Sequence, residues 1–391
     1  MLIEGGDVVL PDRIIRKGAV LMLAGKVHAV GPTDRVAADV PAGCVRVNAA
    51  NHLVCPSLWD IHIHGCGGVS TEVMTTDGLA RMGAFLAQRG VGAFLPTTVA
   101  SEQILSRMAA ALEGADLLPD LQTRALGIYV EGPFVAPARK GGIPQEILRE
   151  PSIEYLRALV EIAGRRIKAM AFAPELPGAS ELFNSLVSLG ILPCLGHSDA
   201  RLEDLSTYES VTPLGITHLF NGMSGISHKE PGLAQWAILN KSVYTELNCD
   251  GTHVHDAAVQ LALRTRPWQR IVVISDAFSP AGLDPSVAGT GEVYGKPVVQ
   301  RGNGVYYADS GVLVGSRRLV NEGVGRLVSQ FSIPLPWAVA MASLNPARHL
   351  GRLEKGALLP GYDADVAVMT RDFDSCSFLA WEGRPIHRTL Q

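Results

Sequence analysis

The chain has 391 residues, of which 47% are hydrophobic and 18% charged, and its formal net charge is −4. This length is sufficient for a large buried core and exceeds that of one small domain. There is no basic run, so we expect no nucleic-acid partner. No apolar segment resembles a signal peptide or a membrane span, and the six cysteines lie far apart with no Cys-x-x-Cys pair. We therefore expect a cytoplasmic protein that is not inserted in a membrane.

The two ends of the chain contain short, strand-like apolar segments bounded by glycine and polar residues. Near the N-terminus these are residues 7–10, 18–23 and 25–31, and near the C-terminus they are residues 361–369 and 377–383. Such segments are typical of strands. We predict that residues 1–50 and 356–391 pair into one small β-sandwich domain.

Between the two ends, apolar strand-like segments alternate with helical segments. The predicted strands are 53–61, 93–98, 125–130, 167–172, 191–196, 214–219, 243–249 and 270–275. Strands of this kind, separated by helices, indicate a parallel sheet that is covered by helices. We predict an α/β fold, a (β/α)8 TIM-like barrel over residues 51–355.

Two further features of the middle segment bear on this fold. A doubly wound open sheet is the alternative, but residues 65–68 lack the Gly-x-Gly-x-x-Gly spacing that would favour it. Residues 285–312 are rich in glycine and contain short β-branched runs, which predicts a β-hairpin between the eighth strand and its helix.

Histidines and carboxylates gather at the predicted strand ends. His62 and His64 are two apart on an extended backbone, so their side chains point to the same side. Other strands end at Glu131, His197, His218, Asp250 with His253 and His255, and Asp276. Active sites of barrels lie at this edge. Imidazoles and carboxylates together form a ligand set for a divalent metal, with zinc first and iron or manganese as alternatives.

Several short motifs follow one another in a fixed order through most of the chain. They are Val-Glu-Gly-Pro-Phe at 130–134, Leu-Gly-His-Ser at 195–198, Thr-His-Leu-Phe-Asn-Gly-Met at 217–223, Glu-Pro-Gly-Leu at 230–233, Ser-Asp-Ala at 275–277 and Leu-Val-Gly-Ser at 313–316. With the His62 and His64 pair, this set resembles the amidohydrolase superfamily. More narrowly, it resembles the N-acetylglucosamine-6-phosphate deacetylase family.

The resemblance implies a metal-dependent hydrolysis of the N-acetyl amide of an amino sugar phosphate. The products from N-acetylglucosamine 6-phosphate are glucosamine 6-phosphate and acetate. The implied metal ligands, for one or two ions, are Glu131, His197 and His218 at a principal position and His62 and His64 at a second one, with Asp276 close by. Asp276 is also the implied catalytic base.

The resemblance also implies how the sugar phosphate is bound. Asn221, Gly222 and a histidine in the segment 253–255, either His253 or His255, are expected to contact the substrate. Lys229 is expected to reach the phosphate bound by the neighbouring subunit, which implies a homodimer.

Two positions depart from the family pattern and leave the substrate open. Ile143 stands where the family often has a histidine, and Lys229 stands where arginine is common. A different or unphosphorylated N-acyl amino sugar is therefore an alternative substrate. An amidohydrolase that uses a modified lysine at the fourth strand is disfavoured, because residues 172–175 read Phe-Ala-Pro-Glu. A scaffold without activity is disfavoured because every expected ligand position is filled.

Overall fold

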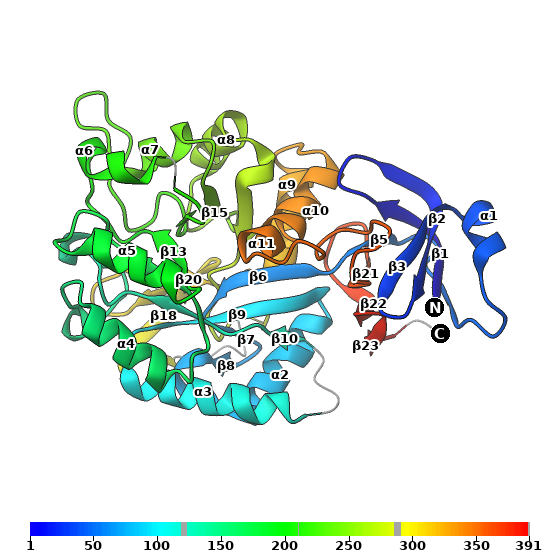
Figure 1. Ribbon diagram of the computed structural model, residues 1–391, viewed down its shortest axis with the longest axis horizontal. Coiled ribbons are helices and arrows are strands. Elements are labelled where there is room, and N and C mark those ends of the chain that lie inside the picture. The colour runs from blue at the N-terminus through cyan, green and yellow to red at the C-terminus, as the bar shows by residue number, and fades with distance from the viewer. Residues whose placement is uncertain (119–122, 210, 285–290, 390–391) are drawn as a thin grey trace.

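The computed structural model describes residues 1–118, 123–209, 211–284 and 291–389. Its centre is a parallel barrel with the predicted strand order, which confirms the predicted fold class (Figure 1). The barrel closes where Asp276 N donates to His62 O at 2.9 Å and His64 N donates to Ala277 O at 2.8 Å. Its strands are β6 (Leu58–Ile63), β9 (Val91–Val99), β11 (Ile128–Glu131), β12 (Ile167–Phe172), β13 (Leu192–Leu195), β14 (Gly215–Ile216), β15 (Tyr244–Asn248) and β16 (Ile271–Ile274), with the short β10 (Arg124–Ala125) beside β9.

Helices surround the barrel and bury their apolar faces against it. In α2, the side chain of Thr75 caps the helix by accepting a hydrogen bond from Gly78 N at 3.0 Å, and Leu79, Met82 and Leu86 are buried on one side. The helices of the barrel are α2 (Thr76–Ala87), α3 (Glu102–Asp116), α4 (Ile153–Ile162), α5 (Ala179–Ser188), α6 (Leu202–Leu205), α7 (Leu233–Leu239), α8 (Asp256–Thr265), α9 (Val320–Ser329), α10 (Leu335–Met341) and α11 (Leu344–His349). Within the described residues, no helix has the length and apolar character needed to cross a membrane.

The two ends of the chain meet in one hydrogen-bonded sheet beside the barrel, as the blue and red segments in Figure 1 show. Strand β1 pairs in parallel with β5, and β5 pairs antiparallel with β21. The sheet runs in the order β23 (Arg384–Arg388), β22 (Cys376–Trp381), β21 (Val366–Met369), β5 (Leu53–Pro56), β1 (Leu2–Val9), β2 (Ile14–Leu23) and β3 (Lys26–Pro32), with β4 (Arg46–Asn48) beside β1 and the short helix α1 (Thr33–Val36) after β3.

The segment predicted as one strand, 53–61, is divided between the two parts of the molecule. Its first half is β5 in the end sheet, and its second half is β6 in the barrel. Pro56 has no N–H to continue a ladder, and Ser57 N donates instead to Asp365 O at 2.9 Å. Leu58 N then donates to Gly90 O at 2.8 Å, at the start of the barrel. The chain therefore crosses from one sheet to the other through the single residue Ser57.

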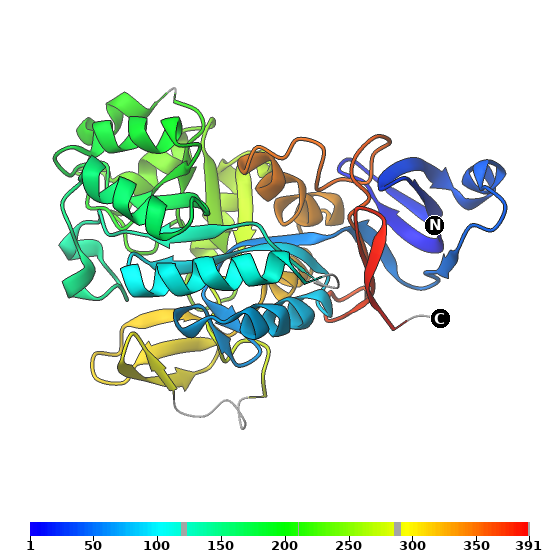
Figure 2. The ribbon, with the colours of Figure 1, turned by 60° about the horizontal axis from the view of Figure 1, so that its bottom comes forward.

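A second sheet is inserted between β16 and α9. It contains β17 (Gly291–Val293), β18 (Lys296–Arg301), β19 (Gly304–Tyr307) and β20 (Leu313–Ser316), all antiparallel. It is drawn in yellow at the edge of the barrel in Figure 2. The predicted hairpin is thus part of a larger sheet, and its residues 285–290 lie outside the described part of the chain. Ser316 N donates to Asp276 O at 2.8 Å, which anchors the sheet at the end of β16.

The small hairpin β7 (Gly65–Cys66) and β8 (Val69–Ser70) follows β6.

Candidate active site

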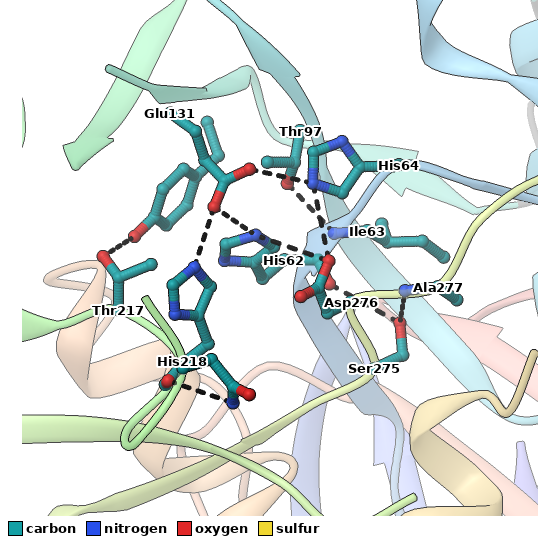
Figure 3. A network of polar contacts seen from close by, with 12 residues as sticks. His62, Ile63, His64, Thr97, Glu131, Thr217, His218, Ser275, Asp276 and Ala277 are labelled. Carbon is teal, nitrogen blue, oxygen red and sulfur yellow. Dashed lines mark hydrogen bonds and ion pairs between the residues drawn. The ribbon is translucent and has the colours of Figure 1, made fainter. Parts of the chain in front are cut away.

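The ends of five barrel strands direct polar side chains toward one point at the mouth of the barrel. Glu131 is the last residue of β11, whereas His197, His218 and Asp276 each lie two residues beyond their strand. These last three have left-handed backbones, with φ of 48°, 26° and 50°. Residues other than glycine rarely adopt this conformation, which is found at functional sites where the surrounding structure enforces it. Figure 3 shows Glu131 and Asp276 among His62, His64 and His218.

Glu131 lies at the centre of the first group. Its Oε1 is 3.2 Å from His197 Nε2 and 3.0 Å from His218 Nε2. The two ring nitrogens are themselves only 3.0 Å apart. His197 Nδ1 donates to Arg139 O at 2.9 Å, so in the neutral ring Nε2 carries a lone pair. The lone pair of His197, the Glu131 carboxylate and His218 Nε2 converge at one point, an arrangement that suits a cation held between them.

His62, His64 and Asp276 form the second group. Asp276 Oδ1 lies 3.5 Å from His64 Nε2 and 3.9 Å from His62 Nε2. His62 Nε2 is buried and, among the described residues, makes no hydrogen bond, although Glu131 Oε1 lies 3.3 Å away. In each group the candidate ligand atoms lie within 4.8 Å of one another. The donor types and this unpartnered nitrogen fit a divalent metal at each group.

The electrostatics of the cluster show the same demand for positive charge. Burial by itself lowers the pKa of His62, but the carboxylates of Glu131, Glu246 and Asp276 outweigh burial and raise this pKa well above its usual value. Burial would raise the pKa of Glu131, but the charge of His62 and the hydrogen bonds of His197 and His218 hold it well below its usual range. The cluster therefore stabilises ionised carboxylates next to a positive charge. Either a protonated histidine or a bound metal ion supplies that charge.

Known proteins are similar to this chain in both sequence and fold. No family model matches the chain. The chain is 35% identical to the N-acetylgalactosamine-6-phosphate deacetylase of Escherichia coli O157:H7, over 88% of this chain and 90% of the relative. It is 31% identical to the N-acetylglucosamine-6-phosphate deacetylase of Bacillus subtilis (strain 168), over 95% of this chain and 93% of the relative. The chain belongs to the N-acetylglucosamine-6-phosphate deacetylase family.

A solved structure supports this membership in the N-acetylglucosamine-6-phosphate deacetylase family. A mutant of the Mycobacterium smegmatis enzyme, in complex with N-acetyl-D-glucosamine-6-phosphate, superimposes with a TM-score of 0.87 at 25% identity, over 99% of both chains. The fold is also shared with an enamidase that is described as a member of the amidohydrolase superfamily, with a TM-score of 0.57 at 15% identity over 99% of this chain. This agrees with the resemblance that the motifs indicate.

A cavity opens over the two groups, and three of the five expected substrate contacts line it. They are Asn221, Gly222 and His253. His253 Nε2 lies 3.2 Å from Asp276 Oδ2, and its Nδ1 lies 2.8 Å from Asp250 Oδ2. His253 therefore connects the cavity to the candidate base of this deacetylase.

The other two expected contacts, His255 and Lys229, do not line this cavity. His255 is exposed and caps α8, where its Nδ1 accepts a hydrogen bond from Ala257 N at 3.2 Å. Lys229 is exposed on the loop between β14 and α7. The roles expected of these two residues stay predictions.

The structure also brings residues to the site that the strand ends do not predict. Ile143 is buried in the cavity wall, beside Phe278, Tyr294 and Val314. The inserted sheet supplies Tyr294 and Val314, and Tyr307 OH donates to Gly142 O at 2.8 Å, which fastens that sheet to the loop of Ile143. The resemblance to the family already pointed to Ile143, but only a knowledge of how the inserted sheet folds back over the barrel could have placed Tyr294 and Val314 at the deacetylase site.

Proposed function

We propose that this chain hydrolyses N-acetylglucosamine 6-phosphate to glucosamine 6-phosphate and acetate. The observation that carries the proposal is the convergence of Glu131, His197 and His218 with Asp276 beneath one cavity. Hydrolysis of an amide needs an activated water, a stabilised oxyanion and a proton for the departing amine. The relative from Bacillus subtilis, an N-acetylglucosamine-6-phosphate deacetylase, supports the same reaction.

The residues of the chain supply the proton transfers. A divalent metal held by the two groups would lower the pKa of water and polarise the acyl carbonyl. Asp276 accepts a proton as the water oxygen forms a bond with the acyl carbon. The carbon–nitrogen bond then breaks, and Asp276 returns the proton to the nitrogen of the leaving amine. His253, 3.2 Å from Asp276 Oδ2, keeps this carboxylate oriented at the cavity.

The identity of the metal and the assembly belong to the same proposal. We propose zinc, in one or two ions, because histidine nitrogens and carboxylate oxygens are ligands that zinc accepts, with iron or manganese as alternatives. We further propose a cytoplasmic homodimer in which Lys229 reaches the substrate of the partner. The ranges proposed for the domains, 1–50 with 356–391 and 51–355, stay a prediction.

A second candidate substrate is N-acetylgalactosamine 6-phosphate. The relative from Escherichia coli O157:H7, 35% identical, has this specificity in its name. The two sugars differ only in the orientation of one hydroxyl group, so the reacting amide and the phosphate are the same. The buried Ile143 in the cavity wall keeps a third candidate open, an unphosphorylated or differently acylated amino sugar.

Acetate release by metal-loaded protein tests these candidates directly. The substrates are the 6-phosphates of N-acetylglucosamine and N-acetylgalactosamine, with unphosphorylated N-acetylglucosamine beside them. We expect the highest kcat/KM with N-acetylglucosamine 6-phosphate and a loss of about 100-fold or more in kcat for Asp276→Asn. Higher kcat/KM with the galactosamine compound would select the second candidate. No release from any of the three, with metal bound, would reject the deacetylase reaction for these sugars.

A further inference from the structure

One carboxylate below the site has no part in the proposed reaction. Glu246 lies in the middle of β15, its side chain is fully buried, and it does not line the cavity. Burying an ionised carboxylate in a barrel core is costly unless hydrogen bonds compensate for the lost water. The contacts of Glu246 therefore show what compensates for its burial and which residues its side chain holds in place.

A single oxygen of Glu246 contacts both candidate metal groups. Oε2 lies 3.1 Å from His62 Nδ1, in the second group, and 3.3 Å from the backbone N of His218, in the first. The main chain of Glu246 adds a third contact at the same point, because its carbonyl accepts from Leu219 N at 2.8 Å.

The contact with His62 determines which ring nitrogen is available to a metal. A carboxylate can only accept, so His62 Nδ1 carries the hydrogen and donates it to Glu246. In the neutral ring, Nε2 then keeps its lone pair and points toward Glu131 Oε1, 3.3 Å away. Without the acceptor, the hydrogen could move to Nε2 and block that ligand position.

The contact with His218 holds a strained turn. His218 has φ of 26°, a conformation that only the surrounding structure can maintain. The hydrogen bond from its N–H to Glu246 fixes the backbone from which the His218 ring reaches Glu131 Oε1 at 3.0 Å.

We propose that Glu246 is a positioning residue that holds both metal groups through one carboxylate oxygen, by fixing the ring of His62 and the turn at His218. Its effect on catalysis rests on the proposed function, whereas its effect on metal binding does not. The class of ligand concerned is a divalent cation at each group.

Metal affinity tests this role without depending on activity. We compare wild type, Glu246→Gln and Glu246→Leu, each stripped of metal, and titrate each with Zn²⁺ in competition with a chromogenic chelator. Leucine fills the space but cannot accept a hydrogen bond, so we expect the affinity for each ion that the wild type binds to fall by about 100-fold. Glutamine keeps a neutral acceptor, so we expect a fall of about tenfold.

The matched control is another buried carboxylate that is remote from the barrel mouth. Asp365, 1% exposed, accepts from Lys355 Nζ at 3.0 Å in the end sheet region. Asp365→Asn should lower the unfolding temperature and leave the affinity for Zn²⁺ unchanged. A Glu246 role limited to packing would give the same result as this control, with full affinity in both Glu246 variants, and would overturn the proposal.

Three other outcomes are decisive. A loss of affinity for one ion only, when the wild type binds two, would overturn the sharing of Glu246 between the groups. If Glu246→Leu does not fold, an affinity in Glu246→Gln equal to that of the wild type would overturn the proposal. If the affinities fall as expected but the wild type releases no acetate, the proposed reaction fails and the role of Glu246 stands.

Discussion

His253 Nε2 lies 3.2 Å from Asp276 Oδ2, and both side chains are buried at the mouth of the barrel. Burial would raise the pKa of Asp276, but the charge and hydrogen bond of His253, together with the charges of His62 and His64, lower it. Burial in turn would lower the pKa of His253, but Asp276 and Asp250 raise it to about 10. Asp276 is therefore kept ionised, which is the form that a base requires.

Replacing His253 should shift the pH dependence of the reaction. In His253→Gln the carboxylate loses its cationic neighbour, so the pKa of Asp276 rises and its ionised fraction at acid pH falls. We expect the acid limb of the kcat/KM profile to move to higher pH. A profile with an unchanged acid limb would show that His253 does not act on the base. His255→Gln distinguishes the two histidines, because His255 caps α8 outside the cavity and its loss should leave that limb in place.

Much of the fold follows from local patterns in the sequence. Most residues of the barrel strands are apolar because helices and neighbouring strands bury both faces, and β9 and β16 are buried along their whole length. The break after Pro56 does not show in this pattern, because β5 and β6 are both fully buried in different sheets. The prediction of the inserted sheet is also incomplete. Strand β20 lies beyond the predicted hairpin, and it pairs with β19 across a loop.

The site is predicted as far as strand ends define it. Parallel strands bring their carboxyl ends to one edge, so His62, Glu131 and Asp276 are expected together whatever the loops do. Glu246 is not found in this way, because it lies inside a strand and its partners are fixed only by the closed barrel. Lys229 is exposed on a loop, and nothing in its local sequence shows which surface that loop faces.

The two metal groups should be separable by substitution. His64→Ala removes a ligand from the second group and leaves Glu131, His197 and His218 in place. If the wild type holds two ions per chain, we expect elemental analysis of this variant to find one. His197→Ala should instead remove the ion of the first group. Equal metal content in wild type and both variants would contradict the assignment of ligands.

Removing the metal should also destabilise the protein. The buried carboxylates and the facing nitrogens of His197 and His218 lose the cation that separates them. A ligand at 100 times its dissociation constant stabilises the native state by about 2.7 kcal/mol. We expect the chelated protein to unfold at a lower temperature and Zn²⁺ to restore both the temperature and the activity. An unfolding temperature that does not change on chelation would show that no ion is held at these groups.

Lys229 should matter only for a phosphorylated substrate. An ammonium group that contacts a phosphate contributes about 1.5–3 kcal/mol, so we expect Lys229→Ala to lower kcat/KM for the 6-phosphate by about tenfold or more. The value for the unphosphorylated sugar should not change. His228→Ala, at the neighbouring exposed position, is the control.

If Lys229 acts across a dimer, dilution should have the same effect as its removal. We expect the KM for the 6-phosphate to rise as light scattering shows the wild type dissociating. A monomer with a full response to the phosphate would place the phosphate contact within one chain.

His349 should make the stability of the protein depend on pH. It is 5% exposed, and burial, assisted by the charge of Arg270, lowers its pKa from 6.5 to about 3. The folded protein therefore keeps His349 neutral at pH values where the unfolded chain binds a proton. Its contribution to stability is complete above pH 6.5 and is lost progressively as the pH falls toward 3.

The size of this effect can be measured against a variant without the titrating ring. At pH 5.5, one unit below the unfolded pKa, the unfolded chain gains about 1.4 kcal/mol from protonation of His349. The free energy of unfolding is measured by urea denaturation at each pH. Between pH 7.5 and 5.5, it should therefore fall by about 1.4 kcal/mol more in the wild type than in His349→Gln. Comparing the two slopes removes the contributions of the other titrating groups, which both proteins share. Parallel slopes would mean that His349 is protonated in the folded protein, and that its surroundings accommodate water and a positive charge.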